Sequence, residues 1–110
     1  MVLTVDGQDV PTNPEGFLLD AAVWSPQIAE ALADRENLQL SDAHWEILWF
    51  IRDYYQKYQH LPNARMFAAA IRKQMGEAKA ASRYLQNLFP QGPLKYACKI
   101  AGLPKPPTCL

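Results

Sequence analysis

The two cysteines are the residues of this chain whose positions suggest chemistry. Cys109 is the penultimate of 110 residues, at the end of a segment, 103–110, that contains three prolines. Prolines exclude a helix and favour an extended, semi-rigid arm, which at about 3.1 Å per residue reaches roughly 25 Å. An exposed thiol on a chain end is a liability without a structural benefit. We therefore interpret Cys109 as a nucleophile presented on a stiff arm.

Cys98 is the second thiol, eleven residues before Cys109. A turn of the arm could bring the two Cα atoms within the about 4.4–6.8 Å that a disulfide spans, with a stabilisation of about 3 kcal/mol from loop closure. A pair that opens and closes suits redox or sulfur-transfer chemistry, although Cys98 is also interpretable as a small buried hydrophobe. Lys95 and Lys99 flank Cys98 and favour its thiolate, whereas the negative end of the helix opposes ionisation.

Other kinds of active site find little support in the sequence. His44 and His60 do not have a zinc-ligand spacing with the two cysteines, so we expect no metal site and no cofactor. The chain lacks a Gly-rich phosphate loop and a readable Ser-His-Asp arrangement. A small redox protein that uses the two thiols stays an alternative, but without a Cys-x-x-Cys motif or a βαβ pattern it does not read as thioredoxin-like.

Charge is distributed unevenly along the chain, although the total is balanced. Residues 1–53 contain ten acids and two bases, and residues 54–110 contain one acid and nine bases. Either the two halves pack together and neutralise each other, or the basic half presents a face to an anionic partner. The candidate partner-binding or anion-binding residues are Arg65, Arg83, Lys95, Lys99 and Lys105.

Composition predicts one small globular domain. Apolar residues make up 49% of the chain and charged residues 20%, and no apolar run is long enough to span a bilayer. The N-terminus does not resemble a secretory signal, and two cysteines do not make a disulfide framework, so we expect a cytoplasmic protein. We expect residues 1–102 to form a compact domain and residues 103–110 a mobile arm.

The predicted fold is mainly α: a small bundle of about five helices with an N-terminal β-hairpin over 2–10 and a flexible C-terminal arm. Capping residues and breakers place the helices at about 26–34, 42–58, 63–75, 78–89 and 94–101, the last ended by Gly102. Ser41 caps the second helix, but His44 stands where a capping box needs Glu or Gln, so we expect an incomplete box. That helix holds six of the twelve aromatic residues, which we interpret as core packing.

A nucleic-acid-binding regulator is a further alternative. The third and fourth helices meet near Gly76 and could form a helix-turn-helix that directs Arg83, Gln86 and Asn87 into a groove. The pattern is weak, because any two short helices around a glycine produce it. Such a protein would bind DNA with a strong salt dependence and without any need for Cys109.

The segment from Ser82 to Leu110 closely resembles the C-terminal signature of the DsrC/TusE family, above all in Gly-Leu-Pro-Lys-Pro followed by a penultimate cysteine. Glu15-Gly16-Phe17-Leu18, Trp24-Ser25-Pro26 and residues 44–55 extend the resemblance over nearly the whole chain. The resemblance implies a helical domain with a hairpin and a mobile arm, and a sulfur carrier rather than an autonomous enzyme. It implies that Cys109 bears the persulfide. Cys98 is typical of DsrC and usually absent from TusE, which serves tRNA thiolation, so the chain looks most like DsrC.

The resemblance also implies partners. In DsrC-like carriers the arm enters a channel of the dissimilatory sulfite reductase catalytic subunits, and the two cysteines hold a disulfide or a trisulfide. Sulfur is also exchanged with relay proteins of the DsrEFH/TusBCD and TusA types, and a membrane-bound oxidoreductase reduces or oxidises the cysteine pair. Residues 80–81 are Ala-Ala where the family often has Gly-Asn, and Pro107-Thr108 replaces the usual Thr-Gly of DsrC. The second departure stiffens the arm tip and opposes its folding back onto Cys98.

Overall fold

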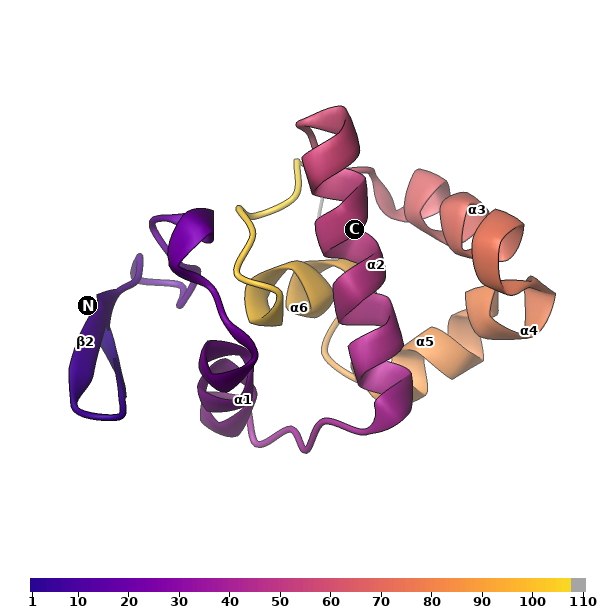
Figure 1. Ribbon diagram of the computed structural model, residues 1–110. Coiled ribbons are helices and arrows are strands. Elements are labelled where there is room, and N and C mark those ends of the chain that lie inside the picture. Colours follow the sequence, from indigo (N-terminus) through magenta and orange to yellow (C-terminus); the bar gives the residue numbers. More distant parts are fainter. Residues whose placement is uncertain (108–110) are drawn as a thin grey trace.

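The computed structural model describes residues 1–107, which form a helical bundle with an N-terminal hairpin (Figure 1). This confirms the predicted fold class. The elements are β1 (Val2–Val5), β2 (Gln8–Pro11), a 3-10 turn η1 (Ala21–Val23), α1 (Pro26–Arg35), α2 (Asp42–Tyr58), α3 (Ala64–Met75), α4 (Glu77–Ala80), α5 (Ser82–Leu88) and α6 (Pro93–Ile100).

The hairpin follows directly from its turn residues. Asp6 and Gly7 both have positive φ angles, 50° and 80°, as a two-residue hairpin turn requires. This turn sets the antiparallel register in which Val5 lies opposite Gln8. Leu3 and Val10 are buried and the hairpin lies against α1, so the two strands are supported by the helical core.

Helix α2 occupies the centre of the molecule, with α1 and the hairpin on one side and α3 to α5 on the other (Figure 1). Ile47, Leu48 and Ile51 are completely buried, as expected for a central helix. The core-packing interpretation of the aromatic residues is confirmed only in part. Trp49 and Tyr58 are about half exposed, at 49% and 48%.

Ser25, Ser41 and Asn63 cap α1, α2 and α3 as predicted. The expectation of an incomplete capping box at Ser41 is wrong. The Ser41 backbone N–H donates to His44 Nδ1 over 3.0 Å, and the Ser41 side chain accepts from the His44 backbone N–H. The His44 Nδ1 thus accepts the backbone hydrogen bond that a Glu carboxylate usually accepts in a capping box. The other ring nitrogen, Nε2, donates to the carbonyl of Leu88 over 2.7 Å and ties α2 to the end of α5.

We expect His44→Ala to lower the free energy of unfolding by about 2–3 kcal/mol, because it removes the acceptor of the Ser41 backbone N–H, one half of the capping box, and leaves the Leu88 carbonyl without its donor. Urea denaturation of the purified protein measures this. His44→Gln places the common capping-box residue at the same position and should recover part of the loss. Equal stabilities for His44→Ala and the native protein would show that neither hydrogen bond contributes.

The predicted helix over 78–89 is in fact two helices, α4 and α5, so the second helix of the helix-turn-helix alternative is not continuous. Ala81 between them has an extended backbone with ψ of 138°. No Gly or Pro marks this break. The break between α4 and α5 follows directly after a buried residue. Ala80, the last residue of α4, is 4% exposed, and α4 packs against α3. Arg83 is exposed on the seven-residue α5, and the Gln86 side chain donates to the carbonyl of Pro90.

Ion pairs join the two oppositely charged halves of the chain. Four of the five ion pairs recorded within residues 1–107 connect an acid of the first half to a base of the second: Lys79–Glu46, Lys95–Glu15, Lys99–Glu36 and Lys105–Glu15. The interpretation that the halves neutralise each other therefore describes much of the charge asymmetry. No helix within the described part of the chain has the length and apolar character needed to cross a membrane.

Candidate functional site at the root of the arm

Cys98 lies in the last turns of α6, where the arm begins. Its side chain is completely buried, and α6 packs against both α1 and α2. The Leu103 N–H donates to the Cys98 carbonyl over 2.9 Å, and the Gly102 N–H donates to the Lys99 carbonyl over 3.2 Å. These two bonds, with Gly102 at a φ of 74°, form the Schellman motif that ends many helices. The first arm residue is thus hydrogen-bonded to the residue that carries the buried thiol.

Two side chains from the first half of the chain donate hydrogen bonds to the backbone at the root of the arm, where α6 ends and residues 101–103 follow. Trp24 Nε1 donates to the Ile100 carbonyl over 2.9 Å, and Arg52 Nη1 donates to the Ala101 carbonyl over 2.7 Å. The Arg52 guanidinium lies 4.1 Å from the centre of a Trp24 ring, and burial lowers its pKa. Together they supply donors to carbonyls that a helix end leaves without intrahelical partners. A cation at the negative end of α6 is also electrostatically favourable.

A rigid loop places Glu15 beside the arm. The Asn13 side-chain oxygen accepts from the backbone N–H groups of Glu15 and Phe17, over 2.9 and 3.0 Å. Gly16 has a φ of 95°, a backbone conformation that favours glycine, and a Cβ there would lie 2.8 Å from Lys99 Cε. Phe17 is 1% exposed and anchors the loop in the core. These constraints fix the backbone that presents the Glu15 carboxylate.

Glu15 contacts two of the predicted basic residues. Lys105 Nζ lies 3.0 Å and Lys95 Nζ 3.9 Å from the same carboxylate oxygen. The hydrogen bond from Lys105 is the main reason that the pKa of Glu15 lies below its ordinary value of 4.5, and the charges of Lys105, Lys95 and Lys99 add to it. A lowered carboxyl pKa means that the contact favours folding above the ordinary pKa and is lost as the pH falls through the lowered one. The contact is therefore fully formed at neutral pH.

Lys99 has a different environment from the other two lysines. Its side chain is only 9% exposed and its Nζ lies 3.0 Å from a Glu36 carboxylate oxygen. The ammonium group also lies over the rings of Tyr96 and Phe17, at 5.0 and 5.7 Å from their centres. A buried, paired ammonium is a structural link between α6 and the end of α1. It is not open to a partner in this arrangement.

The structure thus brings together some predicted site residues and separates others. Lys95, Lys99 and Lys105 gather with Cys98 at the root of the arm, and all three pair with glutamates. Arg65 on α3 and Arg83 on α5 are exposed. Helices α3 and α5 lie on the opposite side of α2 from the arm (Figure 1). Cys109 and its predicted closure onto Cys98 lie outside the described residues. Sequence reasoning assigned no role to Glu15, Trp24 or Arg52, since only their tertiary contacts reveal one.

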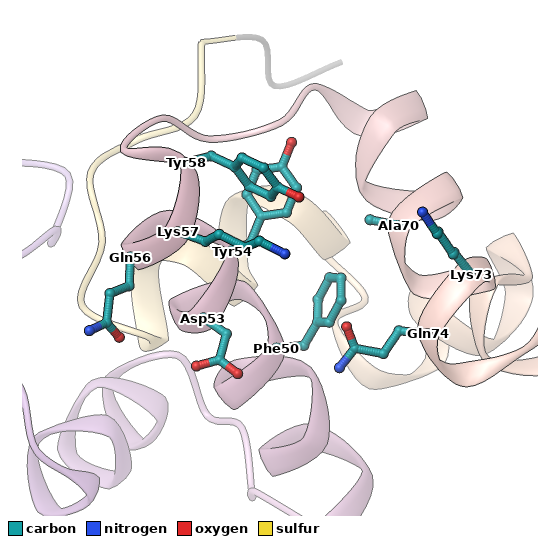
Figure 2. A pocket seen from close by; sticks show the side chains of 9 residues that line it. All are labelled: Phe50, Asp53, Tyr54, Gln56, Lys57, Tyr58, Ala70, Lys73 and Gln74. Carbon is teal, nitrogen blue, oxygen red and sulfur yellow. The ribbon is translucent and has the colours of Figure 1, made fainter.

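A separate groove of about 650 Å³ lies between α2 and α3. It is lined by Phe50, Asp53, Tyr54, Gln56, Lys57, Tyr58, Ala70, Lys73 and Gln74 (Figure 2). Two lysines and two tyrosines give its wall a mixed cationic and aromatic character. None of the described residues predicted from the sequence as site residues lines it, so the groove is distinct from the root of the arm.

Comparison with known proteins identifies the family of this chain. A protein-family model described as DsrC like protein matches residues 4–110. The chain belongs to the DsrC-like family. This DsrC-like chain is 47% identical over 109 residues to a protein of Haemophilus influenzae named sulfurtransferase TusE homolog, and the alignment covers 99% of this chain and 100% of that one. The predicted DsrC/TusE membership is therefore confirmed.

Solved DsrC structures have the same architecture. The NMR structure of Allochromatium vinosum DsrC superposes on this DsrC-like chain with a TM-score of 0.90 at 42% identity, over 100% of both chains. The crystal structure of the oxidised gamma-subunit of the dissimilatory sulfite reductase (DsrC) from Archaeoglobus fulgidus gives 0.86 at 38% identity, again over 100% of both chains. Proteins named DsrC and proteins named TusE thus both match this chain from end to end.

Proposed function

We propose that this DsrC-like protein is a cytoplasmic sulfur carrier of dissimilatory sulfur metabolism rather than an autonomous enzyme. Cys109 accepts sulfur as a persulfide, and Cys98 is its partner thiol. The observation that carries the proposal is the bond from the Leu103 N–H to the Cys98 carbonyl, which roots the proline-rich arm at the buried thiol. Cys98 is fully buried, so we do not assign it the role of the first acceptor from an external sulfur donor.

The chemistry requires only thiolates and a sulfane-sulfur donor. The Cys109 thiolate attacks the sulfane sulfur, the donor's S–S bond breaks, and its electron pair leaves with the donor thiolate. Attack by the Cys98 thiolate on Cys109 Sγ then expels hydrosulfide and leaves a disulfide, whose reduction takes two electrons from the membrane-bound oxidoreductase. If the sulfur is instead retained between the cysteines as a trisulfide, the thiolate and the persulfide together lose two electrons, which the membrane-bound oxidoreductase accepts.

Dissimilatory sulfite reductase catalytic subunits and relay proteins of the DsrEFH/TusBCD and TusA types are the proposed exchange partners. Support comes from the similarity to a DsrC described as the gamma-subunit of dissimilatory sulfite reductase. The presence of both cysteines is the feature of this sequence that favours the DsrC branch.

Intact mass spectrometry after incubation with inorganic polysulfide tests the carrier function. We expect a mass increase of one sulfur atom that dithiothreitol removes, and loss of that sulfur when dissimilatory sulfite reductase catalytic subunits are added. Absence of any uptake would contradict direct loading of the protein by a sulfane-sulfur donor.

A TusE-like relay for tRNA thiolation is the second candidate. It is favoured by relatives named sulfurtransferase TusE, among them that of Escherichia coli at 43% identity over 99% of this chain. The two candidates differ in the acceptor. Transfer of sulfur from the loaded protein to a tRNA-thiolating enzyme, and not to dissimilatory sulfite reductase, would favour the TusE-like function.

A further inference from the structure

The groove between α2 and α3 plays no part in the proposed sulfur chemistry. Its α2 wall includes positions 50, 53, 54, 57 and 58, and its α3 wall includes positions 70, 73 and 74. Spacings of three and four residues place each set on one face of its helix. In Figure 2, Phe50 and Gln74 extend into the space between the two helices. Two helix faces therefore form the walls of one concave surface.

The groove has an apolar floor and an exposed apolar rim. Phe50 is 6% exposed, and the centre of its ring lies 6.5 Å from that of Phe67 on α3. At the rim, Tyr58 is 48% exposed. Met66 lies four residues before Ala70, on the same face of α3, and is 46% exposed. Large apolar side chains left in water beside a concave surface are typical of a site that receives apolar groups of a partner.

Lys57 and Lys73 lie on opposite walls of this groove, and both are exposed. Of the six lysines in the chain, the other four pair with glutamates. Lys57 and Lys73 form no ion pair with any of residues 1–107, and Lys57 Nζ lies 5.4 Å from the centre of the Tyr58 ring. Neutralisation within the chain, which occupies the other lysines, thus leaves these two cations for an external anion.

The side chains around the two lysines favour protein carboxylates over nucleic-acid phosphates. Asp53 lines the same groove and would repel phosphates, and two lysines beside one aspartate are less positive than a nucleic-acid-binding surface usually is. The ring centres of Tyr54 and Tyr58 lie 4.7 Å apart, and each lies 6.2 Å from the centre of the His60 ring. Because these rings pack on one another, they offer less free face for stacking of bases.

We propose that the α2–α3 groove binds an acidic amphipathic helix of a protein partner. The apolar side chains of that helix contact Phe50 and Tyr58, and its carboxylates pair with Lys57 and Lys73. A groove between two helix faces is suited to a third helix with the same spacing of side chains. The acidic helix α1 of a second copy does not supply this occupant, because the apolar face of α1 is buried in its own core. The interaction goes beyond sulfur transfer, since it requires neither cysteine.

Selection from a displayed library of random peptides, each about 16 residues long, tests the chemistry of the partner with the full, reduced chain as the target. We expect the enriched sequences to carry Asp or Glu together with apolar residues at spacings of three and four. The strongest binder is then synthesised, labelled and measured by fluorescence anisotropy. Its addition should shift the ¹H–¹⁵N amide signals of the segments 53–58 and 70–74, which contain the lining residues other than Phe50.

Lys57→Gln/Lys73→Gln should weaken binding of that peptide roughly tenfold, because it removes both ion pairs. The matched control is Arg65→Gln/Arg83→Gln, which removes the same charge from exposed residues outside the groove. The control should change the affinity by less than about twofold. Tyr58→Ala should weaken binding at least about fivefold, because it removes the half-exposed aromatic contact at the rim.

An equal loss of affinity in the two double variants would reduce the interaction to net charge and overturn the proposal. Failure to enrich any sequence, enriched peptides without acidic residues, or amide shifts confined to other segments would do the same. A single-stranded RNA of about 16 nucleotides is the competing probe. If it binds more tightly than the peptide, with the same dependence on Lys57 and Lys73, the groove is a nucleic-acid site instead.

Polysulfide uptake is measured on the same variants and should equal that of the native protein, because both cysteines are retained. Normal uptake with no peptide binding would reject the groove proposal and leave the carrier function standing. Peptide binding without any sulfur uptake would do the reverse.

Discussion

Replacing Cys109 with serine is expected to reduce sulfur uptake from inorganic polysulfide to background, a loss of at least about 100-fold. The serine hydroxyl has nearly the shape of the thiol but is not ionised near neutral pH, so it cannot attack a sulfane sulfur. Cys109 lies outside the described residues 1–107, and the change from sulfur to oxygen is small, so we expect the variant to fold like the native protein. Intact mass spectrometry before and after reduction measures the effect.

Cys98→Ala is the matched comparison for Cys109→Ser. Cys98 is completely buried, so alanine is a better replacement than serine, whose hydroxyl would be buried there. We expect Cys98→Ala to take up sulfur at close to the native rate and to lose only the closure of the two cysteines. Uptake that survives Cys109→Ser and disappears in Cys98→Ala would reverse the assigned roles.

Gly102→Ala is expected to destabilise the protein by about 3–4 kcal/mol, the largest effect on stability of any change proposed for this chain. A Cβ at this position would lie 2.3 Å from Trp24 Cδ1 and 2.8 Å from Trp24 Cγ. Trp24 has little freedom to yield, because its ring is bonded to the Ile100 carbonyl and lies against Arg52. The positive φ of Gly102, 74°, adds backbone strain for any residue with a side chain.

Gly7→Ala separates the two causes. Gly7 has a similar φ of 80°, but a Cβ there would meet nothing within 4 Å. It should show only the backbone strain, about 1–2 kcal/mol. Urea denaturation of both variants gives the difference, which reports the steric contact with Trp24. Equal losses for the two variants would show that Trp24 does not hold the root of the arm.

The sequence by itself determined the features that depend on a few neighbouring residues. The caps at Ser25 and Asn63, the Asp6-Gly7 turn and the helix end at Gly102 all match the structure. Each is governed by local backbone sterics or by a side chain that bonds to a backbone group within three residues, and such physics is readable from sequence. The cysteines were identified as candidates in the same way, from residue type and position alone.

Only the tertiary structure decided which charged and aromatic residues meet. Glu15 and Lys105 are 90 residues apart, Trp24 and Ile100 are 76 apart, and Arg52 and Ala101 are 49 apart. Helix α6 packs against α1 and α2 close to the second and third of these contacts, and the first joins the loop at Glu15 to the arm. No local sequence pattern contains these arrangements. The same holds for Lys99. The charge distribution predicted that it binds a partner, but in the structure it is buried and paired with Glu36, and so it links α6 to the end of α1. Long-range packing thus brings acids from the first half of the chain into contact with bases from the second half at the root of the arm.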